Sequence, residues 1–259
     1  GLESRKAHLI YGLCQLAPFR LILAEDERRA REIYEDYRFY DKKIYLYPAR
    51  DLLFFQADIH GNLLIRQRMQ VVRALMEEKE LAVVTSIDGC MDFLESLEQI
   101  REQLLHFTSD STVNIDALKA RLVWLGYERV GQVEMPGQFS IRGGIVDIYC
   151  LTEENPWRIE LWGDEIDSIR SFDAESQRSL ENLEEITIYP AVEHPGEKAQ
   201  LSFLDYFPAE KSVVFLDEPN RLVEKGQAVE EEYSQSSLHR AEKGEENLPE
   251  NWLCSFEKV

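Results

Sequence analysis

Short apolar runs alternate with amphipathic helical segments over the first hundred residues, and this alternation restricts the possible folds more than any other feature of the chain. Each run has the length and composition of a strand that is buried on both faces. The runs are Phe19–Ala24, Lys43–Tyr47 and Leu81–Thr85, and the helices between them are Glu25–Phe39 and Asn62–Lys79. Strands that are separated by single helices predict a parallel sheet with helical crossovers.

Residues 101–188 have a different pattern. One predicted helix, Ile115–Leu125, stands among short β-type segments, several of which are joined by Gly-Gly or Gly-Asp pairs as in antiparallel hairpins. These segments are Gln103–Thr108, Arg129–Val133, Ser140–Tyr149, Arg158–Trp162, Asp167–Phe172 and Glu185–Tyr189. The region therefore predicts a small α+β domain.

The last part of the chain returns to the first pattern. Ser212–Leu216 predicts one more buried strand and Arg221–Tyr233 a helix, whereas the polar stretch 240–251 predicts a loop. Because one strand cannot form a sheet alone, we expect it to complete the earlier sheet. The predicted fold class is α/β: a discontinuous parallel-sheet domain of residues 1–100 and 189–259, with the α+β domain 101–188 inserted.

The charge and the spacing of special residues exclude several classes of function. With 49 acidic and 29 basic residues the net charge is −20, which argues against a general nucleic-acid binder, because such a protein needs a basic face. No apolar run approaches the roughly 18 residues of a transmembrane helix, so no membrane partner is expected. The 4 cysteines and 5 histidines form no disulfide or metal-ligand pattern, and the chain fits a reducing cytoplasm.

The first seven residues have the position of a phosphate-binding loop without its composition. A P-loop needs a glycine before its lysine and a hydroxyl residue after it, but Arg5 and Ala7 flank Lys6. Asp217 and Glu218 follow a predicted strand as a magnesium-binding acidic pair would, a combination that also arises by chance where strands end. Lys6, Asp217 and Glu218 therefore predict at most a vestigial nucleotide site without ATP turnover.

One predicted strand in the middle region carries the sharpest binding signal. Alternation along Arg158–Trp162 places Arg158, Glu160 and Trp162 on one exposed face and the two aliphatic residues between them on a core face. Tryptophan and arginine are enriched at the energetic centres of protein interfaces. Arg142 stands before two glycines in another predicted strand. The structural alternative is that Arg158 pairs with Glu160 or Asp164 and that Trp162 covers an apolar edge.

Four stretches of the chain match motifs of a known family. They are YPARD (47–51) with RQR (66–68), QFSIRGGIVDI (138–148), RIELWGDEIDSIRSFD (158–173) with SQR (176–178), and IYPA (188–191). These stretches resemble the N-terminal UvrB-homology module of the bacterial transcription-repair coupling factor family. The two middle stretches are long and follow the order of the family, and together the four span most of the chain.

The resemblance implies a degenerate helicase-like domain that is interrupted by a small UvrA-binding domain. It implies that Arg142, Arg158 and Trp162 bind UvrA, with Trp162 at a position where many relatives have phenylalanine. It also implies that residues 1–7 are a remnant of the P-loop of UvrB. Only a short segment separates Pro48 from the helix that begins near residue 62, so the DNA-probing β-hairpin of UvrB is missing.

The resemblance also implies a role for the parent protein. With Mg-ATP it would translocate on duplex DNA and displace stalled RNA polymerase, through domains that lie C-terminal to Val259. The chain described here would bind UvrA without catalysis and without a cofactor, and would so recruit nucleotide excision repair to the lesion. In the resting parent, a C-terminal domain would mask the UvrA-binding face.

Two other functions are compatible with the residues. The chain could be a weak NTP-binding or NTPase domain that uses the vestigial P-loop, in which case Mg-ATP should raise its melting temperature. It could instead be a UvrB-like module that grips DNA, in which case its binding should fall steeply with salt concentration.

Overall fold

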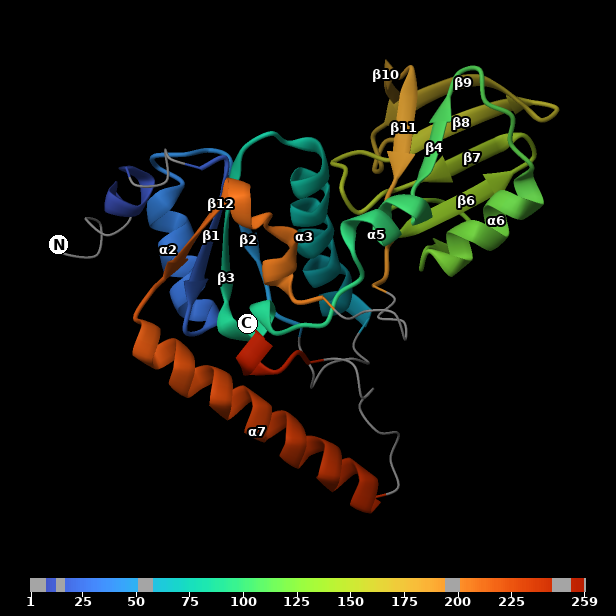
Figure 1. Cartoon of the computed structure of the whole chain (residues 1–259). Coiled ribbons are helices and arrows are strands. Elements are labelled where there is room, and N and C mark those ends of the chain that lie inside the picture. Colours follow the sequence, from blue (N-terminus) through green and yellow to red (C-terminus); the bar gives the residue numbers. More distant parts are fainter. Residues whose placement is uncertain (1–7, 13–16, 51–57, 194–200, 244–252, 259) are drawn as a thin grey trace. The chain divides into compact units, whose positions relative to one another are not determined.

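The computed structural model describes residues 8–12, 17–50, 58–193, 201–243 and 253–258. The chain forms two compact units (Figure 1). Unit 1 consists of Gly1–Phe55, Val71–Leu97 and His194–Val259, and unit 2 consists of Gln56–Gln70 and Glu98–Glu193. No helix in these described ranges is both long and apolar enough to cross a membrane. The helicase-like character of the first domain and the boundaries at residues 100 and 189 stay predictions.

A four-stranded parallel sheet forms the centre of unit 1, as the alternation of apolar runs and helices predicted. Its strands are β1 (Phe19–Ala24), β2 (Ile44–Tyr47), β3 (Leu81–Ser86) and β12 (Ser212–Leu216), in the order β12-β1-β3-β2 (Figure 1). The late strand β12 pairs with β1, with Phe19 opposite Ser212. The central strands β1 and β3 are almost wholly buried, which explains their uninterrupted apolar sequences.

Helix α2 (Glu27–Tyr37) packs its apolar stripe against this sheet. The side chain of Asp26 caps the helix, because its Oδ1 accepts a hydrogen bond from the backbone N–H of Arg29 at 2.7 Å. The buried side chains of the helix and of three strands form one core cluster, which contains Ile22, Ala24, Ala30, Ile33, Tyr37, Ile44, Ala82 and Val84. The predicted helix Glu25–Phe39 is confirmed with slightly narrower bounds.

The segment after residue 200 adds an aromatic block to the core of unit 1. Phe203, in the short 3-10 helix η1 (Phe203–Tyr206), stacks on Tyr47 of β2 with ring centroids 3.7 Å apart. Tyr206 and Phe207 contact Phe203 edge-on. Phe203 and Tyr47 are both almost completely buried, so this late segment is part of the core and not a surface tail. A second short 3-10 helix, η2 (Ala209–Lys211), leads into β12.

Four further helices follow along the chain, and one of them corrects the sequence analysis. They are α3 (Asp58–Glu77), α4 (Ile87–Cys90), α7 (Pro219–Lys243) and the 3-10 helix η3 (Phe256–Lys258). The predicted end of this helix at Tyr233 is wrong, because α7 continues to Lys243. The predicted loop 240–251 is wrong over residues 240–243, and the rest of it lies outside the described residues. Its polar part is rich in glutamate and glutamine, which favour helix, and polarity alone therefore did not indicate a loop. The backbone of η3 packs on α7, where the N–H of Phe256 donates to Glu230 at 2.8 Å.

We expect Asp88 to make the stability of unit 1 dependent on pH. Burial raises the pKa of its carboxyl, and Glu27 and Asp92 raise it further, whereas Lys225 lowers it. The folded state therefore binds this proton more tightly than the unfolded state, and stability should fall as the pH rises from the unfolded pKa through the folded one. We expect Asp88→Asn to raise the free energy of unfolding at neutral pH. The variant should also lose the part of the dependence of this free energy on pH that Asp88 causes. Urea unfolding between pH 3 and 7 measures both effects, and a less stable variant at pH 7 would contradict them.

Unit 2 contains a six-stranded, mainly antiparallel sheet and a separate two-stranded sheet. The larger sheet has the order β10-β9-β8-β7-β6-β5, and the smaller one pairs β11 with β4 (Figure 1). The strands are β4 (Leu105–Thr108), β5 (Glu128–Arg129), β6 (Gln138–Arg142), β7 (Ile145–Ile148), β8 (Trp157–Trp162), β9 (Glu165–Phe172), β10 (Ser179–Asn182) and β11 (Glu185–Ile188). The helices are α5 (Leu97–Gln103) and α6 (Ile115–Trp124), the latter capped by Asn114, whose Oδ1 accepts from Ala117 N–H at 2.9 Å.

The predicted strand Arg129–Val133 is wrong over most of its length. Only Glu128 and Arg129 pair with β6, and after the Val130 N–H, which donates to the carbonyl of Phe139 at 2.9 Å, the chain leaves the sheet. The carbonyl of Gly131 accepts a hydrogen bond from the hydroxyl of Ser140, and Val133 turns inward to pack with Tyr149 and Phe172. Val130 and Val133 therefore lie in a loop that packs over the sheet, and not in a strand. Strand β10 has the fully exposed sequence SLEN and carried no apolar signal.

Candidate functional site

One face of the large sheet in unit 2 carries a row of polar side chains. The row consists of Ser140, Asp147, Arg158 and Arg170, which lie opposite one another on β6, β7, β8 and β9. The next row, one residue along, consists of Ile141, Val146, Ile159 and Ile169, and it takes the opposite face because side chains alternate along a strand. The sheet thus has an apolar core face and a polar face.

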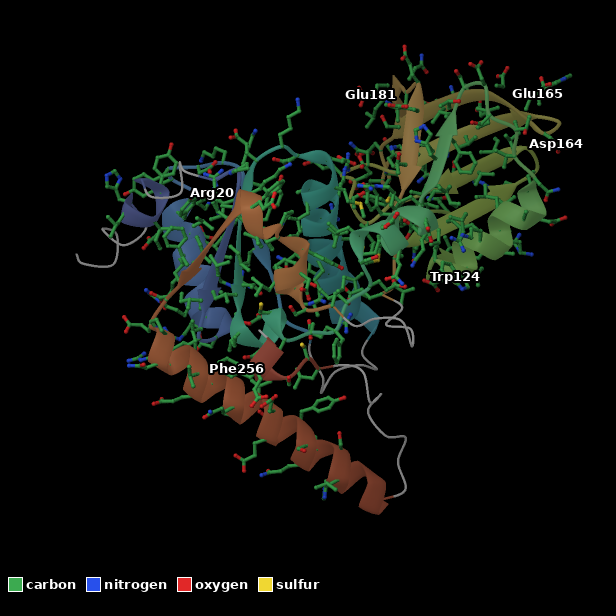
Figure 2. All side chains as sticks on the ribbon, in the orientation of Figure 1. Arg20, Trp124, Asp164, Glu165, Glu181 and Phe256 are labelled. Carbon is green, nitrogen blue, oxygen red and sulfur yellow. The ribbon has the colours of Figure 1, made fainter. Side chains whose placement is uncertain are left out.

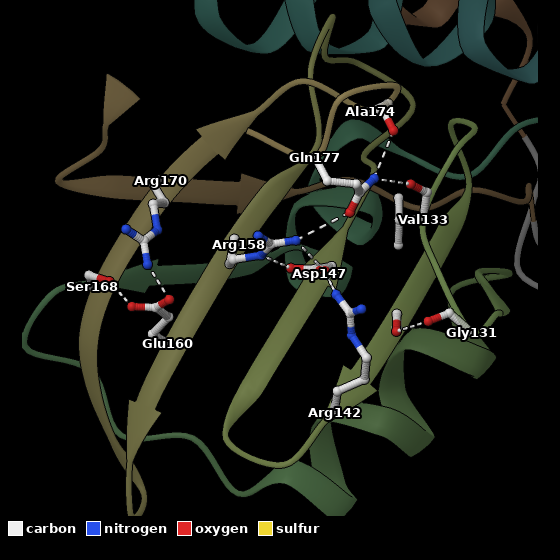
Figure 3. A network of polar contacts seen from close by, with 11 residues as sticks. Gly131, Val133, Arg142, Asp147, Arg158, Glu160, Ser168, Arg170, Ala174 and Gln177 are labelled. Carbon is white, nitrogen blue, oxygen red and sulfur yellow. Dashed lines mark hydrogen bonds and ion pairs between the residues drawn. The ribbon is translucent and has the colours of Figure 1, made fainter. Parts of the chain in front are cut away.

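Asp147 joins the two arginines that the sequence singled out. Arg158 donates from Nε to Oδ1 of Asp147 at 2.7 Å and from Nη2 to Oδ2 at 2.9 Å (Figure 3). Arg142 donates from Nη2 to the same Oδ2 at 2.7 Å. The Asp147 side chain is fully buried, so the carboxylate holds both guanidinium groups in fixed positions. Two cations share one anion here, which leaves a local excess of positive charge.

The outer side of Arg158 is covered by a glutamine and a phenylalanine. Oε1 of Gln177 accepts from Nη2 of Arg158 at 3.3 Å, and Nε2 of Gln177 donates to the carbonyls of Val133 and Ala174 (Figure 3). The guanidinium lies 4.4 Å from the ring centre of Phe172. The hydrogen bonds to Asp147 raise the pKa of Arg158, although burial acts in the opposite direction, so this group stays charged.

The predicted exposure of Arg158 is therefore wrong, since only 15% of its side chain is accessible. The structural alternative named the wrong partners as well. Glu160 forms its ion pair with Arg170 and accepts a hydrogen bond from Ser168, while the true partner of Arg158 is Asp147 (Figure 3). The reason is the sheet register, which places Asp147 directly opposite Arg158 on the neighbouring strand.

Trp162 is the most exposed large apolar side chain among the described residues, with 82% of its surface accessible. It ends β8 and is followed by Gly163, whose positive φ of 66° makes the turn into β9. Arg142 ends β6 in the same way, before Gly143 with a φ of 60°. Because β6, β7, β8 and β9 form a meander, these two turns lie at the same end of the sheet. A half-exposed arginine and an exposed tryptophan thus mark one end of the polar face.

The second residue after Arg142, Gly144, has no room for a side chain. A Cβ atom at this position would lie 2.8 Å from the carbonyl oxygen of Leu161. The Gly144 carbonyl also accepts a hydrogen bond from the Leu161 N–H at 2.8 Å. The backbones of Gly144 and Leu161 therefore approach closely, and this contact fixes the β6–β7 turn beside the end of β8.

The vestigial nucleotide residues are not brought together as a site by the described structure. Lys6 lies outside the described residues. Asp217 is only 7% exposed and accepts from Nε of Arg29 at 2.6 Å, so its carboxylate stabilises the link between β12 and α2. Glu218 follows in a left-handed conformation, with φ at 55°. Within the described ranges, no cluster of three or more His, Cys, Asp or Glu residues could hold a metal ion.

Two residues of the site escaped the sequence analysis. Asp147 was quoted only inside a family motif, yet a lone aspartate in the apolar strand IVDI needs a buried partner, and that need was a usable signal. Gln177 carried no such signal, because its role depends on a φ of 59°, on the carbonyl of Ala174 in its own loop and on the carbonyl of Val133 in another loop. Figure 2 draws the side chains of the described residues and labels Asp164 and Glu165 at the turn between β8 and β9.

Comparisons with known proteins find similarity to the same family as the sequence motifs. Residues 105–194 match the family described as the UvrB interaction domain. The chain is 40% identical to the transcription-repair-coupling factor of Bacillus subtilis over 163 residues, which are 62% of the chain and 14% of that relative. The chain is homologous to transcription-repair-coupling factors. The predicted relationship is thereby confirmed.

Other relatives of the same description match similarly. The transcription-repair-coupling factor of Staphylococcus aureus (strain bovine RF122 / ET3-1) is 35% identical over 153 residues, and that of Staphylococcus haemolyticus is 34% identical over 152 residues. Each match covers 59% of the chain and 13% of the relative. The chain thus spans about one seventh or less of the length of the transcription-repair-coupling factors that it matches.

Proposed function

We propose that this chain binds UvrA through the polar end of its UvrB interaction domain, and so recruits nucleotide excision repair to RNA polymerase stalled at a DNA lesion. The observation that carries the proposal is the pairing of exposed Trp162 with half-exposed Arg142 at one end of a rigid sheet, inside the region 105–194 that matches the UvrB interaction domain. An exposed tryptophan beside an arginine has the composition of an interface hot spot.

The same proposal assigns no chemistry to the chain itself. Unit 1 is proposed to be a degenerate helicase-like domain that needs no cofactor, and the engagement of Asp217 with Arg29 supports this. ATP-driven translocation on duplex DNA, contact with RNA polymerase, and masking of the UvrA-binding face by a C-terminal domain are proposed for the whole protein. A melting temperature that Mg-ATP leaves unchanged is the expected result for this chain, and a clear rise would favour the NTP-binding alternative.

Trp162→Ala tests the docking role. We expect this change to weaken UvrA binding by about 30-fold, since loss of a hot-spot aromatic side chain costs about 2 kcal/mol or more. Thermal stability should change little, because the Trp162 side chain is 82% exposed. Isothermal titration calorimetry with purified UvrA measures the affinity.

A matched control is Trp124→Ala, which removes the same residue type from α6 of the same unit, at a side chain that is 44% exposed. This variant should bind UvrA as the wild-type chain does. Equal losses in both variants would mean that the effect is not specific to the β8–β9 turn, and no wild-type binding at all would contradict the proposed function.

A further inference from the structure

We infer that Arg158 is a positioning residue, not a contact residue, and that it acts through Asp147 to present Arg142 to the partner. This inference rests on the proposed function and refines it, because it gives the two arginines different roles: Arg142 contacts the partner and Arg158 holds Arg142 in position. Arg142 and Trp162 form the contact end of the face. Asp147, Arg158 and Gln177 form a support behind it.

The hydrogen bonds of Arg158 point inward. Its Nε and Nη2 groups are engaged by Asp147 and Gln177, at distances of 2.7 to 3.3 Å. Its flat side lies over Phe172, which is completely buried. A partner that approached Arg158 would have to displace these contacts, and only 15% of the side chain is accessible before that happens.

Arg142 has the opposite character. It gives a single Nη2 donor to Asp147, and 48% of its side chain is exposed. An arginine carries five N–H donors in a rigid fork, so most of the donors of Arg142 are left for a carboxylate or carbonyl group of a partner. It also lies at the same end of the sheet as Trp162, whereas Arg158 lies in the register row of Ser140 and Asp147.

Gln177 acts as a clamp on this support. It adopts a left-handed conformation, with φ at 59°, which is unfavourable for a residue other than glycine. In this conformation its amide joins Arg158 to the carbonyls of Val133 and Ala174, and so ties two loops over the guanidinium. The strain is explained if the clamp keeps Arg158 in contact with Asp147.

Removal of Arg158 should change the position of Arg142. Oδ1 of Asp147 would lose its donor, and the nearest mobile donor is the guanidinium of Arg142, which already binds Oδ2. A buried carboxylate without a full set of donors is costly, so Arg142 would turn inward to form a two-pronged contact with Asp147. Its exposed donors would then be withdrawn from the partner.

A double-mutant cycle on the full chain tests the inference by calorimetry with UvrA. Arg142→Ala and Arg158→Ala should each weaken binding by about tenfold, and the double variant by about 10- to 20-fold instead of the hundredfold expected for independent contacts. The control cycle pairs Arg158→Ala with Trp162→Ala, where the losses should multiply. Multiplying losses in the Arg142 cycle would overturn the inference and leave the proposed function standing. Absence of wild-type binding would overturn both.

Gln177→Ala provides a second test that keeps the guanidinium groups intact. If Arg158 touched the partner, opening the clamp would expose it and strengthen binding. Our inference predicts an affinity that is equal to or several-fold weaker than that of the wild-type chain. In the free chain, proton exchange of the arginine Nε–H groups, followed by nitrogen-15 NMR, should be slow for Arg158 and fast for Arg142. Tighter binding by Gln177→Ala, or fast exchange at Arg158, would overturn the inference.

Discussion

Replacing Asp147 with alanine should destabilise unit 2 by about 3–5 kcal/mol, the usual cost of breaking a buried ion pair by removal of one partner. The carboxylate of Asp147 is fully buried, and its Oδ1 accepts the hydrogen bond from Nε of Arg158. Without it, Arg158 would keep its charge between Phe172 and Gln177 but would lose the carboxylate that accepts its hydrogen bonds. Amide hydrogen exchange along β7 and β8, together with thermal unfolding, measures the loss.

Two control variants separate charge from position. Asp167→Ala removes an aspartate from strand β9 of the same sheet at an exposed position, and should change stability by less than about 0.5 kcal/mol. Asp147→Asn keeps one acceptor oxygen and should lie between the alanine variant and the wild-type chain. If Asp147→Ala were as stable as Asp167→Ala, the carboxylate would not hold the two arginines in solution.

The second large effect is expected in unit 1, where Phe203→Ala should cost about 3–5 kcal/mol, as for other large aromatic residues removed from a core. Its ring stacks on Tyr47 at 3.7 Å and also contacts Tyr206 and Phe207, so the change leaves a cavity lined by rigid aromatic groups. Urea unfolding, with exchange of the β2 and β3 amides as the local measurement, gives the size of the effect.

Phe39→Ala is the matched control, because that ring is 79% exposed and belongs to the same unit. It should be nearly neutral. A similar small change in Phe203→Ala would mean that the segment after residue 200 does not complete the core in solution.

The parts of the structure that follow from single segments could be predicted from the sequence. Strand β1 has the predicted bounds, because a buried strand needs only a continuous apolar run to be visible. Strand β12 also has the predicted bounds, but its predicted burial is wrong: it pairs with β1 alone at the edge of the sheet, and Val214 and Leu216 are exposed. Trp162 was expected to be exposed for a similarly local reason, the alternation of side chains along β8. In each case the information lies within about six neighbouring residues.

The parts that depend on pairing between segments could not be predicted in this way. The partner of Arg158 is chosen by the register of β7 against β8, which places Asp147 opposite it and leaves Glu160 to Arg170. Strand β10 exists because β9 offers it an edge, although its own sequence is polar. The sequence therefore indicated the strand that carries Arg158 and Trp162, whereas the hydrogen-bond partners of these residues depend on the three-dimensional arrangement.

The neighbouring position of β1 and β12 has a consequence for biosynthesis. Residue 19 pairs with residue 212, so the sheet of unit 1 cannot be completed until β12 has emerged from the ribosome. Unit 2 ends at Glu193 and has all of its strands available earlier. Contacts between distant residues also close slowly. We therefore expect unit 2 to fold first on the nascent chain. Until β12 has been synthesised, strands β1, β2 and β3 would lack their full set of sheet partners and would stay accessible to chaperones.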